Sequence, residues 1–209
     1  MPVYRIAVYP LHPVSDARYV RAAHHLGLTE IETCTVARLF FLEGDFTPTE
    51  AEHLARELLT DPVTEKFKGG VQVLAAGERR IEVTFLPGVT DPVAENLRHA
   101  AHLIGIKTLE RVATGQSYTV QSNLNGEAMR RLATEVFCNP LIQRFVVDEG
   151  ITPPFVPYQT ADATVEIVNL RGVDDARLLA ISAERRLALD INEMRAIRDY
   201  YDEIQREPT

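Results

Sequence analysis

The sequence predicts an α+β fold made of two tandem copies of one small unit, followed by a helical segment. The stretch LLTDPVTEKF at residues 58–67 recurs in pattern as VFCNPLIQRF at residues 136–145. The offset of 78 positions between them holds without a gap from Leu26 to Phe67 in the first copy. In each copy, hydrophobic patterns of period 2 and 3.6 follow in the order strand, helix, strand, strand, helix, strand. This order is a split βαβ unit, an antiparallel sheet with two helices on one face.

The second copy shows how each element is assigned. Residues 81–85 alternate apolar and polar side chains, as in a strand with one buried face. Asp91 can cap the next helix, and Pro92 suits its first position because the missing N–H would be unpaired there. Gly105 ends this helix. The following stretch, TLERVATGQSYTVQS, predicts two strands around Gly115.

The second helix of each copy has its own start and stop signals. Thr47, Pro48 and Glu50 form a capping box with proline at the first helical position. In the second copy the helix NGEAMRRLATEVF stops at Asn139-Pro140, and RFVVDE is a short last strand. One unit of about 70 residues leaves an open sheet face and bare edges. We therefore expect the two copies to cover each other as an internal pseudo-dimer that is monomeric through this surface.

The boundaries follow from these patterns: a first repeat at 1–76, a second at 77–150 and a third segment at 151–209. The third segment opens on GITPPFVPY, which predicts a stiff proline-rich linker. A strand is expected at ATVEIVNL, and helices at VDDARLLAISAERR and DINEMRAIRDYYDEIQ. The last helix has a capping box at Asp190 and Glu193. Its apolar face is our candidate for docking a partner: Met194, Ile197, Tyr201 and Ile204.

Composition excludes several classes of protein. The net charge is −8 and no basic run occurs, which disfavours binding to a nucleic-acid backbone. No apolar stretch approaches the ~20 residues of a membrane span, and the N-terminus lacks a signal-peptide pattern. Cys34 and Cys138 are the two cysteines, and we expect reduced, half-buried thiols. The prediction is a cytoplasmic protein.

No motif for catalysis, cofactor binding or metal binding is evident in the sequence. It has no glycine-rich phosphate loop, no cysteine-pair metal spacing and no nucleophile turn. His99 and His102 lie one helical turn apart, but no third ligand is obviously placed beside them. His24 and His102 occupy matched positions at helix ends, which favours a structural role over catalysis.

The motifs LPGVTDP, LLTDPVTEKF and VFCNPLIQRF resemble PurS, the small subunit of phosphoribosylformylglycinamidine (FGAM) synthase. The second copy matches the turn before the first helix at Gly88, Val89, Asp91 and Pro92, but continues with Val-Ala where the family has Gln-Gly. The first copy has LHPVSDA in place of the turn. The stretch LLAISAERRLALDINEMRAIRDYYDEIQREPT resembles the linker region that opens PurL, the large subunit. Thr209 after proline is a natural helix cap with no helix after it, so we expect that the natural polypeptide continues, and a frayed natural end is the alternative.

The resemblance implies the N-terminal region of an amidotransferase of de novo purine biosynthesis. The whole enzyme would use ATP, Mg²⁺ and glutamine, with no cofactor in this chain. The implied role is a non-catalytic scaffold, inactive alone, that joins the synthetase and glutaminase parts and helps shape the route for ammonia. The alternative is a regulatory domain, because tandem split βαβ units also sense small molecules where two units meet.

Overall fold

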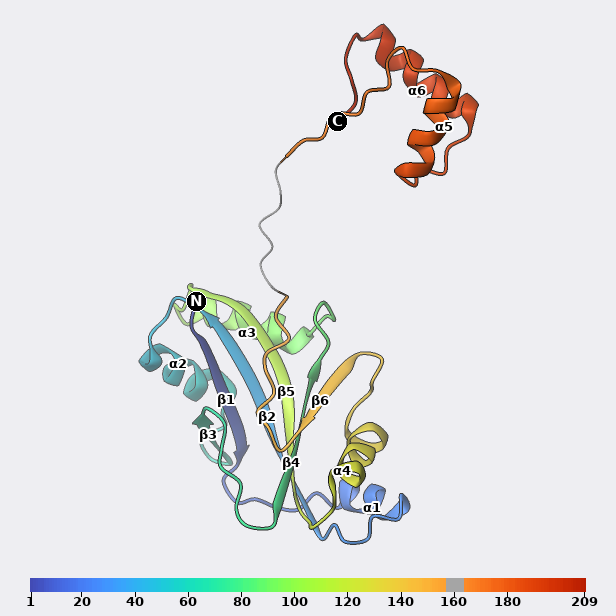
Figure 1. The fold of residues 1–209 in the computed structure, drawn as a ribbon. Helices are drawn as coiled ribbons and strands as arrows, with labels where there is room; N and C mark the ends of the chain where they lie inside the picture. The colour runs from blue at the N-terminus through green and yellow to red at the C-terminus, as the bar shows by residue number, and fades with distance from the viewer. Residues whose placement is uncertain (157–163) are drawn as a thin grey trace. The chain divides into compact units, whose positions relative to one another are not determined.

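The computed structural model describes residues 1–156 and 164–209, and the chain divides into two units, Met1–Pro157 and Tyr158–Thr209. In the described part of the first unit, six antiparallel strands form one sheet in the order β3-β1-β2-β5-β4-β6 (Figure 1). The strands are β1 (Val3–Pro10), β2 (Thr33–Gly44), β3 (Glu65–Gly69), β4 (Glu78–Phe85), β5 (Leu109–Gln121) and β6 (Gln143–Val147). The helices of this unit are α1 (Ala17–His25), α2 (Pro48–Leu54), α3 (Pro92–Leu103) and α4 (Gly126–Leu132), and π-helical turns η1 (Ala55–Leu59) and η2 (Ala133–Phe137) continue α2 and α4. The α+β class is confirmed.

The two halves of this unit repeat the same elements at the same spacing. The bounds of α2, η1 and β3 recur 78 positions later as those of α4, η2 and β6. The sheet joins the halves through β2 and β5, where Arg38 lies opposite Gln116. These two residues are also 78 positions apart. An approximate twofold axis relating the halves therefore passes through this pair.

The expected break in the sheet at Gly115 does not occur, so the prediction of two strands there is wrong. β5 runs unbroken from Leu109 to Gln121 and pairs with β2 on one side and β4 on the other. A Cβ atom at Gly115 would lie 2.6 Å from the carbonyl oxygen of Val83. The glycine thus permits a close approach of the β4 backbone rather than a turn. Each half contributes three strands to the sheet, instead of the four of a split βαβ unit.

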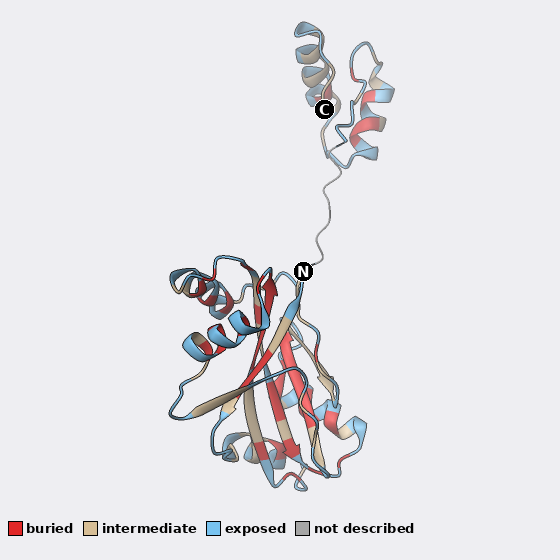
Figure 2. Ribbon diagram, turned by 90° about the vertical axis from the view of Figure 1, so that its left-hand side faces the viewer, coloured by how far each residue is buried: buried red, intermediate tan, exposed pale blue. Residues whose placement is uncertain are grey.

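All four helices of the first unit pack on one face of the sheet, in two separate cores (Figure 2). Each core takes helices from both halves. α3 of the second half packs with α2 and η1 over β1 and β2, where Leu97 and Ala101 are buried. α1 of the first half packs with α4 and η2 over β4 and β5, where Ala23 is buried. Separating the halves would therefore open both cores.

The helix starts follow the sequence signals. Asp91 accepts a hydrogen bond from the Ala94 N–H at the start of α3, and Thr47 and Glu50 form the capping box of α2. These caps are confirmed. Both second helices end in a π-helical turn, and in η2 the Cys138 N–H donates to the Ala133 carbonyl at 2.8 Å. The wider turn ends each helix before the Asp-Pro or Asn-Pro pair.

The other face of the sheet is partly covered by the chain that follows β6. Ile151 is buried there with Ala7, Leu39 and Phe41, and Phe155 packs against this cluster. Residues 150–156, which we expected to act as a linker, therefore begin as part of the first unit. The last proline of that stretch, Pro157, and Tyr158 lie outside the described residues.

The second unit holds two helices, α5 (Asp175–Glu184) and α6 (Ile191–Glu203), in its described part. They enclose a small core of Leu170, Leu178, Ile181 and Met194. The capping box of α6 is confirmed. The strand expected at 163–170 does not form over its described residues. The backbone there bonds the C-terminal tail instead, since the Val168 N–H donates to the Pro208 carbonyl. No helix in the described parts of the chain is long and apolar enough to cross a membrane.

We predict that Gly115→Ala destabilises the first unit by about 1–3 kcal/mol, because the new methyl group meets the β4 backbone. Gly69→Ala is the matched control, since the nearest atom to its Cβ would be 3.9 Å away. It should change the free energy of unfolding by less than about 0.5 kcal/mol. Urea unfolding followed by circular dichroism measures both. Equal effects of the two changes would contradict the close approach at Gly115.

We also predict that Phe67→Ala and Phe145→Ala lower one shared unfolding transition. The two phenylalanines occupy equivalent positions on β3 and β6, and each is partly buried against one of the two cores. Each change should cost about 2 kcal/mol, less than for a fully buried phenylalanine. The measurement is urea unfolding of a fragment ending at Val156. Two transitions, each moved by only one of the changes, would show that the halves fold separately.

Candidate functional site

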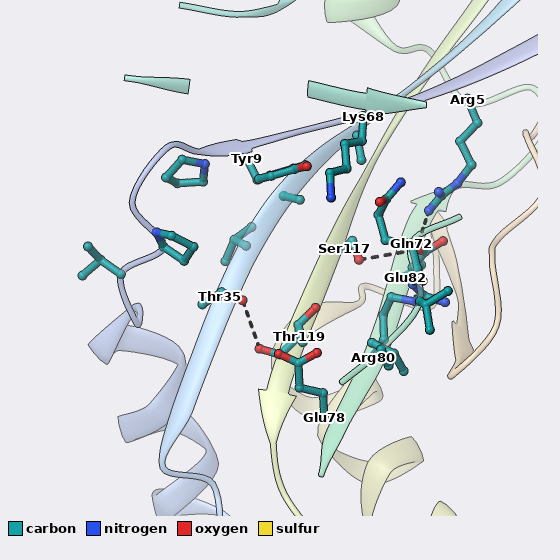
Figure 3. A pocket seen from close by; sticks show the side chains of 18 residues that line it. Arg5, Tyr9, Thr35, Lys68, Gln72, Glu78, Arg80, Glu82, Ser117 and Thr119 are labelled. Atoms are coloured by element: carbon teal, nitrogen blue, oxygen red, sulfur yellow. Dashed lines mark hydrogen bonds and ion pairs between the residues drawn. The ribbon is translucent and has the colours of Figure 1, made fainter. Parts of the chain in front are cut away.

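A cavity of about 360 Å³, lined by charged and apolar residues, lies on the sheet face opposite the helices (Figure 3). Its floor comes from β1, β2, β4 and β5, and residues 72–74 between β3 and β4 contribute a wall. Both halves of the unit therefore line it. Its charged residues are Arg5, Lys68, Glu78, Arg80 and Glu82.

An ion cluster crosses the two halves at this cavity. Glu82 is 1% exposed, and its carboxylate lies 2.5 Å from Arg5 Nη2 and 3.3 Å from Arg80 Nε. The Ile151 N–H donates to the other carboxylate oxygen at 2.8 Å, and the Ser117 hydroxyl lies 3.4 Å from the oxygen that faces Arg5. A buried carboxylate is stable only when paired in this way. The cluster thus fixes the chain after β6 to the sheet.

The two arginines are equivalent residues of the two halves. Arg5 opens RIAVY on β1 and Arg80 opens RIEVTF on β4. The Gly70 N–H donates to the Arg5 carbonyl at 2.9 Å, and the Asp148 N–H donates to the Arg80 carbonyl at 2.8 Å. Gly70 and Asp148 are 78 positions apart and both have positive φ, 72° and 58°. A residue with left-handed backbone conformation therefore follows the edge strand at the equivalent position in each half.

Some donor groups at the cavity make no hydrogen bond with the described residues. The Tyr9 hydroxyl and Arg80 Nε are buried and have no hydrogen-bond partner among the described residues. Figure 3 shows the Tyr9 hydroxyl and the Lys68 side chain directed toward the interior of the cavity. Arg80 Nη1 donates to the Gln72 carbonyl at 2.7 Å, which holds the guanidinium in place. The arrangement offers positive charge and hydrogen-bond donors, which suits binding of an anion.

A second cavity of about 380 Å³ lies near the twofold axis on the helix-bearing face. Its lining includes Asp91 and Pro92 of the turn before α3, together with Arg38, Thr114 and Gln116. One Asp91 oxygen caps α3 and the other accepts from the N–H and hydroxyl of Thr114 at 2.8 and 2.7 Å. Asp91 thus ties the first helix of the second half to the central strand.

The residues predicted to dock a partner lie in the second unit, where most contact its own core. Met194 is 1% exposed and belongs to that core, and Ile197 packs against it. Tyr201 is half-buried, and Ile204 is 44% exposed. Only part of the predicted face is therefore exposed within this unit, and its docking role stays a prediction.

The histidines and cysteines discussed in the sequence analysis do not form a site in the described parts of the chain. His24 Nε2 lies 2.8 Å from the Ile31 carbonyl oxygen, whereas His99 and His102 are exposed. In the described parts of the chain, no three His, Cys, Asp or Glu side chains gather as metal ligands. Both cysteines are free and buried, not half-buried as expected, and burial raises the pKa of Cys34 to about 12.

Sequence reasoning missed the ion cluster at the cavity. Glu82 alternates with buried residues on β4, which is typical of a side chain that faces water. One signal was present, since Arg5 and Arg80 align when the first strands of the two copies are compared. Glu82 lies two positions after Arg80, and this spacing can indicate an ion pair. It does not show that the pair is buried.

Comparison with known protein families finds a match at residues 78–149 to PurS, described as phosphoribosylformylglycinamidine (FGAM) synthase. These residues run from β4 to the chain just after β6, and they form a PurS-like region. The match links the chain to FGAM synthase and to purine biosynthesis. A search of curated proteins finds no match to the chain.

We predict that Glu82→Gln destabilises the first unit by about 3 kcal/mol, because Arg5 and the buried Arg80 lose the carboxylate that pairs with both. Glu52→Gln is the control, an exposed glutamate on α2 that should shift the free energy of unfolding by less than about 0.5 kcal/mol. Adding Arg5→Met to Glu82→Gln should cost less than the sum of the single changes, since the unpaired charge is removed. Urea unfolding of the four variants tests this. If the double variant loses as much stability as the two single changes added together, Arg5 and Glu82 do not interact as a buried ion pair.

Proposed function

We propose that this chain is a non-catalytic scaffold of FGAM synthase made of two tandem PurS-like units. The observation that carries the proposal is the match of residues 78–149 to the PurS family. The first half supports it, because its second helix, π-helical turn and edge strand have the same bounds 78 positions earlier. In this reading the sheet is an internal pseudo-dimer, and the chain is a monomer through that surface.

The scaffold couples a glutaminase part to an ATP-dependent synthetase part. Ammonia released from glutamine must reach the synthetase site without loss to water, so the two parts need a fixed arrangement. A sheet stabilised by two cores that share helices is a rigid element for this purpose. We assign ATP and Mg²⁺ to the synthetase part, and we expect the scaffold to help shape the ammonia route.

The second unit is proposed to be the start of a PurL-type linker. The exposed surface at Ile204, the residue at the C-terminal cap of α6, is the surface we expect to contact the synthetase part. Limited proteolysis compares its stability with that of the sheet. Because its core holds few buried residues, we expect cleavage after Gly150 before cleavage within residues 80–145.

We predict that the purified chain makes no amidine product and hydrolyses neither ATP nor glutamine. Mixed with synthetase and glutaminase parts, it should raise glutamine-dependent amidine formation at least tenfold. Formation from added ammonium chloride should change little, because free ammonia does not need the protected route. The measurement is amidine product per unit time under both nitrogen sources.

The control is the chain with Glu52→Gln, which should act as the unchanged chain does. Equal glutamine-dependent rates with and without the chain would refute the coupling role. Turnover by the chain alone, abolished by a point change within it, would refute the non-catalytic role.

A further inference from the structure

We propose that the cavity bounded by Arg5, Lys68 and Arg80 binds a small anionic metabolite through a carboxylate or phosphate group. The proposal is independent of the coupling role, because it rests on the cavity alone. It concerns the sheet face opposite the helices, which neither core uses.

The charge balance of the cavity favours an anion. Three cationic side chains line it against two carboxylates, Glu78 and Glu82. Both carboxylates already accept hydrogen bonds, Glu82 as described and Glu78 from the Ala75 N–H at 2.8 Å. Lys68 is exposed at the cavity and forms no ion pair with any described residue. One positive charge therefore remains to be balanced by a ligand.

Two buried donors also make no hydrogen bond with the described residues. The Arg80 side chain is 7% exposed, and its Nε lies 3.3 Å from the Glu82 carboxylate as an ion pair but makes no hydrogen bond with the described residues. The Tyr9 hydroxyl at the edge of the cavity also makes no hydrogen bond with them. Buried donors without acceptors are costly, and a native protein usually satisfies them with water or a ligand. An oxyanion supplies several acceptors at once.

The size and walls of the cavity suit a metabolite rather than a macromolecule. A volume of about 360 Å³ is at the lower end of small-molecule sites. Ala7, Val73 and Leu74 add apolar surface beside the charged groups. Because β1 and β4 come from different halves, a bound ligand would contact both and stabilise the folded unit.

The test is isothermal titration calorimetry and thermal unfolding of the full chain with three probes: inorganic phosphate, AMP and L-glutamate. Sodium chloride keeps the ionic strength constant. At least one probe should bind and raise the melting temperature. Lys68→Met should weaken that binding about tenfold or more, and Tyr9→Phe should weaken it severalfold, because each removes one donor to a charged group.

Two matched variants control for charge and for the tyrosine change. Lys107→Met removes an exposed charge outside the cavity, and Tyr200→Phe changes an exposed tyrosine of α6. Both should bind as the unchanged chain does. A response to phosphate and AMP alone assigns the phosphate group, and a response to glutamate alone assigns the carboxylate. The proposal is overturned if no probe binds, or if Lys107→Met weakens binding as much as Lys68→Met.

Discussion

The antiparallel pairing of β2 with β5 is the contact on which the first unit depends. It joins strands of 12 and 13 residues from different halves and makes one sheet of two three-stranded groups. A three-stranded group alone would expose an unpaired long strand, which is a site for aggregation. The pairing removes this edge and leaves only the five-residue strands β3 and β6 at the borders. Short edges of this kind limit pairing with other chains.

The same pairing sets where the helices can pack. With β2 and β5 paired at the centre of the sheet, the first helix of each half packs over strands that also carry the second helix of the other half. Each core is then complete only when both halves are folded. This arrangement accounts for a stable unit in which neither half encloses a core of its own.

Local signals predicted the local structure, and long-range contacts account for the rest. The caps at Asp91 and Thr47 depend on neighbours three residues away, so the sequence alone indicates them. The role of Gly115 depends on the Val83 carbonyl, which lies on another strand. Glu82 occupies a position in the alternating pattern of β4 that is typical of a solvent-facing residue. It is buried because Arg5 on β1 and Ile151 after β6, both distant in the sequence, contact its carboxylate. Apolar residues at helical spacing likewise show that one face of a helix is buried, but they do not show which strands it packs against.

Glu82 breaks the approximate symmetry between the two halves of the sheet. In a dimer of identical subunits, every side chain near the twofold axis has a symmetric mate, so charges there occur in even numbers. Here the two arginines remain as a pair, whereas the equivalent of Glu82 in the first half is Ala7. One carboxylate thus lies between two guanidinium groups, an odd count that exact symmetry forbids. Because the two halves belong to one chain, residues at equivalent positions can differ between them, and the face that both halves line can carry an uneven distribution of charge.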